Sequence, residues 1–134
     1  MWTWTVLQMQ AIKSSALTLV LTASMAAQAS PIISVSCSGM SERKITWPAR
    51  YPDTVSITVD LANKTLTLEN DGERFPITTA IAHWITANGR DNRGNTVSIL
   101  LDRATSKLSI EIFNDKRQLT WDFTGRCELV QRSS

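Results

Sequence analysis

Residues 97–123 read VSILLDRATSKLSIEIFNDKRQLTWDF, and apolar side chains recur at every second position through most of this stretch. Two short polar segments divide it into three runs, whose alternating apolar positions are Val97, Ile99, Leu101, Leu108, Ile110, Ile112, Leu119, Trp121 and Phe123. A period of two is typical of strands that bury one face. The stretch therefore predicts three successive strands with a common buried face.

The same alternation recurs upstream, in residues 55–61 and again in residues 66–68, with a polar turn between them. Asp71-Gly72 supplies the positive φ angles of a tight hairpin, which leads into a further strand at residues 75–77. No segment after Ile32 has the period of a helix. Short strands joined by short polar turns predict an all-β domain, a single antiparallel meander that forms a small barrel or a sandwich.

Two neighbouring segments fit the pattern less well. In residues 78–87, Ile81 and Ile85 share one parity while Trp84 has the other, which predicts a bulge or a strand buried on both sides. Residues 88–95 are polar and glycine-rich and are predicted to form a loop. Its candidate binding residues are Arg90, Asp91, Asn92 and Arg93. Their side chains and backbone amides suit an anionic group, although the solubility of a loop explains the same composition.

The first 29 residues have the layout of a cleaved signal peptide. Lys13 precedes an apolar run at residues 16–23, and Ala27-Gln28-Ala29 matches the A-x-A cleavage pattern. Met9 fits the true translation start better than Met1, because the residues between them are apolar where positive charge is usual.

Cleavage after Ala29 is expected to leave a single β domain over residues 30–134, in a length that allows only one domain. Polar residues interrupt the apolar run, whereas a membrane-spanning helix needs about 20 predominantly apolar residues. Ser30 and Pro31 follow the cleavage point, where lipid attachment would need a cysteine. We therefore expect a periplasmic or secreted protein without a stable membrane anchor.

Two cysteines remain in the expected mature chain, Cys37 and Cys127. Exported proteins mature where thiols oxidise, so the two are predicted to form a disulfide between the first and last strands. Their parity matches that of the neighbouring apolar residues, which places both sulfurs in the core. Two free thiols or a metal site are the alternatives, but a structural zinc site needs four clustered ligands and the chain has one histidine. No metal and no cofactor are expected.

Residues suited to catalysis are few. The one histidine, His83, lies in an apolar run beside Trp84, where packing in the core or at an edge explains it better than a role as a base. The acidic residues of the predicted strands mostly fall on outward positions or adjoining turns, where solvation explains them: Asp60, Glu69, Asp102, Glu111 and Asp122. We therefore expect no enzymatic activity.

Charge and motifs also disfavour nucleic acid as a partner. Lys13 is the only charged residue of the leader, so 13 basic and 12 acidic residues remain and the mature net charge is about +1. No P-loop, dinucleotide fingerprint or calcium-binding loop occurs in the sequence.

Asp102-Arg103-Ala104-Thr105-Ser106 joins two of the predicted strands. The segment resembles a hairpin, strand then D-R-x-T-G then strand, of small exported bacterial proteins of unassigned function that often carry a cysteine near the C-terminus, as Cys127 does. Asp102, Arg103 and Thr105 match, and Ser106 stands where glycine is usual. In such a turn Asp102 and Thr105 accept backbone hydrogen bonds and Ser106 takes a left-handed conformation. The resemblance implies fold and export, not an activity.

Three functions fit these observations. The first is a non-catalytic exported domain that binds a protein or envelope component through its loops and one strand edge. The second is an inhibitor of a hydrolase, which inserts Arg90 or Arg93 of the 88–95 loop into an enzyme cleft. The third is a hydrolase that uses carboxylates alone, for which two acids about 5 to 10 Å apart in a groove are required.

Overall fold

Residues 32–130 are described by the computed structural model, and they form one antiparallel sheet closed into a barrel. The strands are β2 (Ile32–Arg43), β3 (Ala49–Asp60), β4 (Thr65–Leu68), β5 (Glu73–Ala80), β6 (Trp84–Arg90), β7 (Thr96–Asp102), β8 (Lys107–Phe113) and β9 (Leu119–Leu129). Each strand pairs with the next, and β9 pairs with β2. The predicted all-β meander is confirmed, as a barrel. The expected leader, its cleavage site and the alternative start lie outside the described residues.

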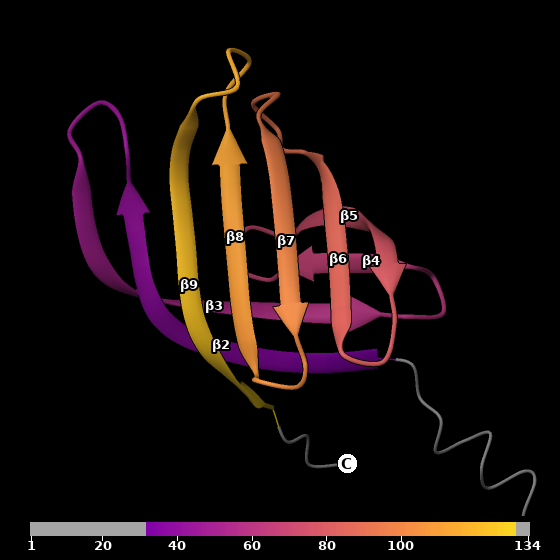
Figure 1. Ribbon diagram of the computed structural model, residues 1–134. Helices are drawn as coiled ribbons and strands as arrows, with labels where there is room; N and C mark the ends of the chain where they lie inside the picture. The colour runs from indigo at the N-terminus through magenta and orange to yellow at the C-terminus, as the bar shows by residue number, and fades with distance from the viewer. Residues whose placement is uncertain (1–31, 131–134) are drawn as a thin grey trace, which may run out of the picture. The chain divides into compact units, whose positions relative to one another are not determined.

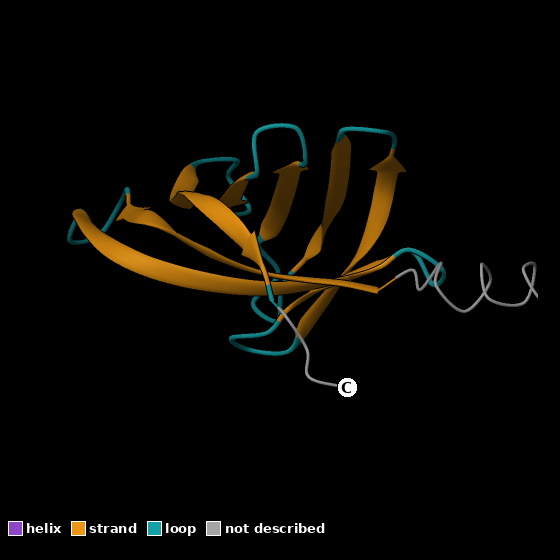
Figure 2. Cartoon of the chain, turned by 90° about the horizontal axis from the view of Figure 1, so that it is seen from below, coloured by secondary structure: helices purple, strands orange, loops and turns teal. Residues whose placement is uncertain are grey.

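The two halves of the barrel cross at a steep angle. Figure 1 shows β6, β7, β8 and β9 nearly side by side, while β2, β3 and β4 run across them. In Figure 2 the described part of the chain consists of strands and loops only. Within residues 32–130 no helix is long and apolar enough to cross a membrane.

The core is formed by the inward positions of all eight strands. The common face predicted for residues 97–123 is confirmed except at Leu119, because Ile99 lies opposite Ile110 and Ile110 lies opposite Phe123. Leu119 lies beyond a register shift between Ile112 and Phe113 and is not part of the core. The buried apolar residues are Val35, Cys37, Val55, Ile57, Val59, Leu66, Phe75, Ile85, Ala87, Val97, Ile99, Leu101, Leu108, Ile110, Phe123 and Cys127.

The predictions for residues 78–95 are confirmed in part. The bulge expected in residues 78–87 is found at Thr78, where the register shifts between Ile77 and Thr79. Residues 78–87 are not one continuous strand, because β5 ends at Ala80 and β6 begins at Trp84. Residues 88–90, predicted as loop, are the end of β6, so that the loop shortens to residues 91–95. Pairing with β7 sets these limits and overrides the local composition.

The turn between β5 and β6 exposes its side chains. His83, which was expected to pack in the core or at an edge, is exposed in this turn, and its backbone oxygen accepts a hydrogen bond from the Arg103 N–H at 2.6 Å. This bond joins the β5–β6 turn to the β7–β8 turn.

The barrel closes along the pairing of β2 with β9. Cys37 lies opposite Cys127, their Cα atoms are 3.9 Å apart, and the predicted disulfide joins them within the core. The next inward pair is Gly39 and Gly125, and a Cβ atom on Gly39 would collide with the carbonyl oxygen of Thr124. Glycine is therefore required at both positions, because the backbones of β2 and β9 leave no room there for a Cβ atom.

Past this pair, β2 and β3 continue as a long hairpin that we call the arm, residues 40–52, with a loop at residues 44–48. Figure 1 shows the arm bending upward beside β9. β2 pairs with β9 as far as Arg43, opposite Trp121. β3 pairs with β4 only over residues 57–60, so residues 49–56 have a strand neighbour on one side only.

The turn after β7 has the conformation expected from its sequence. Asp102 Oδ1 accepts the N–H groups of Ala104 and Thr105, at 3.0 and 3.3 Å. Ser106 has φ of 60°, the predicted left-handed conformation, and its carbonyl accepts the Cys127 N–H at 2.7 Å. Thr105 takes part through its backbone N–H and not as the expected acceptor. Asp102 alone therefore organises the start of this turn.

Removing the disulfide should lower the stability of the domain substantially. It joins residues separated by 90 positions, and loss of such a cross-link typically costs about 2 to 5 kcal/mol. We expect a double variant, Cys37→Ala with Cys127→Ala, to unfold at a clearly lower urea concentration. Wild-type protein treated with a reductant should unfold at the same midpoint as the variant. An unchanged midpoint would show that the disulfide is not needed to close the barrel.

Ser106→Gly should stabilise the domain, because the left-handed conformation strains a residue that has a Cβ atom. The greater unfolded-state freedom of glycine limits the gain to a few tenths up to about 1 kcal/mol. Ser106→Ala, which keeps the Cβ atom, serves as the control and should give no gain. Urea midpoints measure both, and a clearly lower midpoint for Ser106→Gly would contradict the strain at this position.

Candidate functional site

The loops at the upper end of the barrel in Figure 1 border an open groove of about 540 Å³. The arm loop forms one wall with Trp47, loop 91–95 contributes Arg93, and Ile112 and Trp121 of β8 and β9 form the floor. Trp47 is 81% exposed, the most exposed of the large apolar side chains in the described residues. An exposed aromatic beside a groove that also holds charged groups is typical of a recognition surface.

The backbone around Trp47 is held firmly in place. Thr46 and Trp47 both have positive φ angles, 49° and 62°. Arg43 donates a hydrogen bond from its guanidinium to the Trp47 carbonyl oxygen at 3.1 Å, and the Lys44 N–H bonds to the Thr120 carbonyl oxygen at 2.9 Å. The arm loop is therefore fastened to its own strand and to β9.

The ammonium group of Lys44 adds an electrostatic tie between the arm and β9. It lies 3.1 Å from a carboxylate oxygen of Glu42 and 3.7 Å from one of Asp122. The hydrogen bond to Glu42 is the largest cause that raises the pKa of Lys44, and the charges of both acids raise it further, while burial acts in the opposite direction. The group therefore stays charged at neutral pH.

Loop 91–95 is organised by the Asp91 carboxylate, which accepts the N–H groups of Arg93 and Asn95, each at 2.9 Å. Arg90 donates to the Gly94 carbonyl oxygen at 3.2 Å, so it braces the loop from the outward side of β6. Of the four predicted binding residues, the structure brings Asp91 and Arg93 to the groove. Arg90 has a supporting role, and Asn92 bonds through its backbone to Glu73.

A second hollow, of about 240 Å³, adjoins the groove and shares Ile112 and Trp121 with it. Its walls are mainly apolar, but Asp53 and Asp71 also line it. Asp53 was not among the residues predicted from the sequence. Its position on the strand could have indicated it, because Asp53 has the same inward parity as Val55.

Asp53 is fixed by hydrogen bonds at both of its carboxylate oxygens. Oδ2 accepts the hydroxyl of Ser41 at 2.7 Å, and Oδ1 accepts the Thr54 N–H at 2.8 Å. Ser41 is fully buried, on the inward side of β2. Nearby, the Trp121 indole N–H bonds to the Tyr51 hydroxyl at 3.1 Å. Polar groups thus line the mouth of the barrel directly above its apolar core.

Glu73, the first residue of β5, lies in the same acidic surroundings. Burial raises its pKa, and the carboxylates of Asp71 and Asp91 raise it further, while the backbone of Asn92 and the charge of Arg93 act in the opposite direction. Negative charge is therefore in excess around Glu73 at this end of the barrel.

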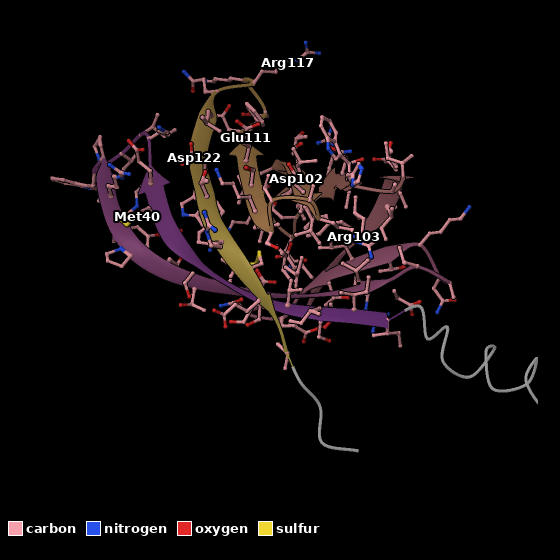
Figure 3. All side chains as sticks on the ribbon, turned by 60° about the horizontal axis from the view of Figure 1, so that its bottom comes forward. Met40, Asp102, Arg103, Glu111, Arg117 and Asp122 are labelled. Atoms are coloured by element: carbon pink, nitrogen blue, oxygen red, sulfur yellow. A yellow bond between two sulfur atoms is a disulfide. The ribbon has the colours of Figure 1, made fainter. Side chains whose placement is uncertain are left out.

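The acidic residues that the sequence placed outward do not join this site. Glu42 and Glu111 both lie opposite Asp122, so a row of three carboxylates crosses the outer face, and Figure 3 shows Glu111 and Asp122 on neighbouring strands. Lys44 forms salt bridges with Glu42 and Asp122 of this row. No group of three or more metal-binding side chains occurs among residues 32–130.

The turn motif lies at the opposite end of the barrel. Arg103 and Ser106 line a hollow of about 380 Å³ there, together with Leu101, Cys127 and Leu129. Figure 3 labels Asp102 and Arg103 on this turn. The motif and the predicted binding loop therefore belong to separate surfaces.

The site contains few elements of a catalytic centre. His83 lies at the opposite end from Ser41, so the one histidine cannot activate that hydroxyl. Asp53 and Asp71 line one hollow, as a carboxylate-only hydrolase requires. Each of them already accepts a backbone N–H, however, Asp53 from Thr54 and Asp71 from Glu73. Both acids therefore have a local structural role, which leaves their other acceptor sites open.

Glu73→Gln should stabilise the domain at neutral pH and not at acid pH. The folded-state pKa lies above the ordinary value of 4.5, so stability falls as the pH rises through the interval between the two. The variant should therefore unfold at a higher urea midpoint than wild type near pH 7, and at the same midpoint near pH 3. Glu69→Gln, at an exposed turn position, is the control. Equal effects of both variants at pH 7 would contradict the role of burial.

Comparison of the chain with protein families, with curated proteins and with solved structures finds no match in any of the three. The function must therefore be argued from the site.

Proposed function

We propose that this protein is an exported, non-catalytic domain that binds another protein through the groove at the upper end of the barrel. The observation that carries the proposal is Trp47, which is 81% exposed although its backbone is held in place. Tryptophan and arginine are the residue types that contribute most to protein interfaces. A tryptophan side chain has only two rotatable bonds, so on a backbone that is already held it loses little conformational freedom on binding.

The surroundings of Trp47 have the composition of a protein interface. Ile45 and Trp121 extend its apolar surface, while Arg43 and Arg93 add donors at the rim of the groove. Interfaces of this kind combine an apolar centre with a polar rim. The export itself rests on the leader sequence and on the disulfide, which favours an oxidising compartment.

Loops, and not a strand edge, provide the binding surface in this proposal. The free side of β3 is blocked for strand addition, because Asn70 bonds to the Ser56 N–H at 3.2 Å and to the Thr54 carbonyl oxygen at 3.4 Å. The Thr54 N–H is taken by Asp53, and Pro52, the next position on this side, has no N–H. Edges protected in this way rarely accept another strand.

Inhibition of a hydrolase is the second candidate. The arm loop protrudes and is preorganised, which suits insertion into an enzyme cleft. Trp47 and Arg93 would then be the inserted residues, whereas Arg90 is engaged within its own loop. This candidate is a special case of the first and uses the same surface.

A photo-crosslinking amino acid at position 47 should capture the partner. We expect one discrete adduct when the protein is irradiated in its own envelope or culture medium. Position 84 is a matched control, because Trp84 is also exposed, at 50%, but lies at the other end of the barrel.

Purified partner then permits a direct binding measurement. Trp47→Ala should weaken binding by about 2 kcal/mol or more, as is typical of a hot spot, and Trp84→Ala should leave it unchanged. Equal adducts from the two positions, or full affinity of Trp47→Ala, would contradict the proposed site. Loss of the partner's catalytic activity on binding would identify it as an inhibited hydrolase.

A further inference from the structure

We infer that the smaller hollow beside the groove receives the side chain of a lysine or arginine from the protein partner. The inference rests on the proposed function, and it adds the chemistry of the group that the partner must present. It is based on three features of the hollow: its apolar walls, its two carboxylates, and the way in which Asp53 is held.

The walls suit the aliphatic part of a basic side chain. Val55, Leu68 and Ile110 line the hollow together with Ile112 and Trp121. Its volume of about 240 Å³ leaves room for one long side chain. Lysine and arginine commonly bury their methylene groups against apolar surface of this kind while the charged end remains near water.

The polar groups of the hollow suit the charged end. Asp53 and Asp71 both line it, and no basic residue does. An ionised carboxylate has about four acceptor sites, and Asp53 uses two of them, for Ser41 and Thr54. The remaining acceptor sites are available to an ammonium or guanidinium group. Trp121 adds an aromatic ring, which attracts a cation at its face.

Asp53 is preorganised for this role. Because Ser41 is fully buried and donates to Oδ2, the carboxylate needs no reorientation to accept a cation. Among residues 32–130 the salt bridges join Lys44 to Glu42 and Asp122, and neither Asp53 nor Asp71 has a basic partner. The negative charge of the hollow is thus left for a group that comes from outside.

The surrounding charges favour the same occupant. Burial is the largest cause that raises the pKa of Glu73, and the charges of Asp71 and Asp91 raise it further, while Arg93 offsets part of this negative charge. The carboxylates of the hollow would repel an anion. An uncharged apolar side chain would displace water from Asp53 and offer no hydrogen bond or charge in its place, which costs free energy. A basic side chain satisfies both the walls and the carboxylates.

The test uses N-acetyl-lysine methylamide as the probe and N-acetyl-norleucine methylamide, which lacks the charge, as its neutral match. The readout is the nuclear magnetic resonance signal of the Trp121 indole N–H, assigned with Trp121→Phe. We expect the lysine probe to shift this signal with a dissociation constant in the millimolar range, and the norleucine probe to have little effect. Equal shifts from both probes, or none, would overturn the inference.

Asp53→Asn isolates the charge, because an asparagine can accept the Thr54 N–H and donate to Ser41. We expect it to weaken binding of the lysine probe about tenfold, in line with the loss of a charge-assisted hydrogen bond. Glu111→Gln, which removes a charge from the outer face of β8, should leave binding unchanged. If Asp53→Asn alters the fold, Asp71→Asn provides the same test from the other wall. Undiminished binding by the variant that folds would contradict the inference.

The probe experiment needs no partner protein, so its outcome is independent of the crosslinking experiment at position 47. Failure of the probe with a successful crosslink would reject the basic side chain and retain the binding site. Probe binding without any adduct would retain the cation site and reject the proposed protein partner.

Discussion

The close approach of β2 and β9 is the constraint on which the rest of the structure depends. A meander has two ends, and this one closes only because its first and last strands pair over residues 35–43 and 121–129. Cys37 and Cys127 join them covalently, and the next inward pair, Gly39 and Gly125, has no side chains that would hold the backbones apart. Closure removes the two exposed edges that an open sheet would present to other chains.

The same closure creates the site. β2 is paired with β3 on one side and with β9 on the other, so both β2 and β3 extend past the end of the core. The inward-facing residues of these extensions therefore line the mouth of the barrel. Val55 is the last buried apolar residue on this side of β3, and Asp53 and Tyr51 follow it with the same parity. Polar groups at these positions line a hollow instead of disrupting the core, since they can bond to Ser41 and Trp121.

The sequence was most informative where strands have one buried face. The alternating pattern identified most of the inward-facing positions in residues 97–123. The disulfide was predicted correctly because the parity of the two cysteines and the oxidising compartment expected for the protein both favoured it. The sequence was least informative at residues 78–95. There the limits of β6 are set by its pairing with β7 and not by the local sequence. The proposed recognition surface was predicted in part. Arg93 was selected from the sequence, and the parity of Asp53 could have placed it inward, but the position of Trp47 depends on how the arm bends, which no local pattern encodes.

The conformation of the arm loop supports the proposal that Trp47 serves binding and does not stabilise the barrel. A left-handed conformation is unusual for a β-branched or bulky residue, and such conformations cost of the order of 1 to 3 kcal/mol each. Thr46 and Trp47 adopt it in succession, and the strained loop leaves the indole in water. Neither feature stabilises the isolated barrel. Trp84 differs, because it is exposed within a regular strand, where its backbone is unstrained and pairs with Asp102. An interaction outside the domain therefore accounts better for the geometry at Trp47.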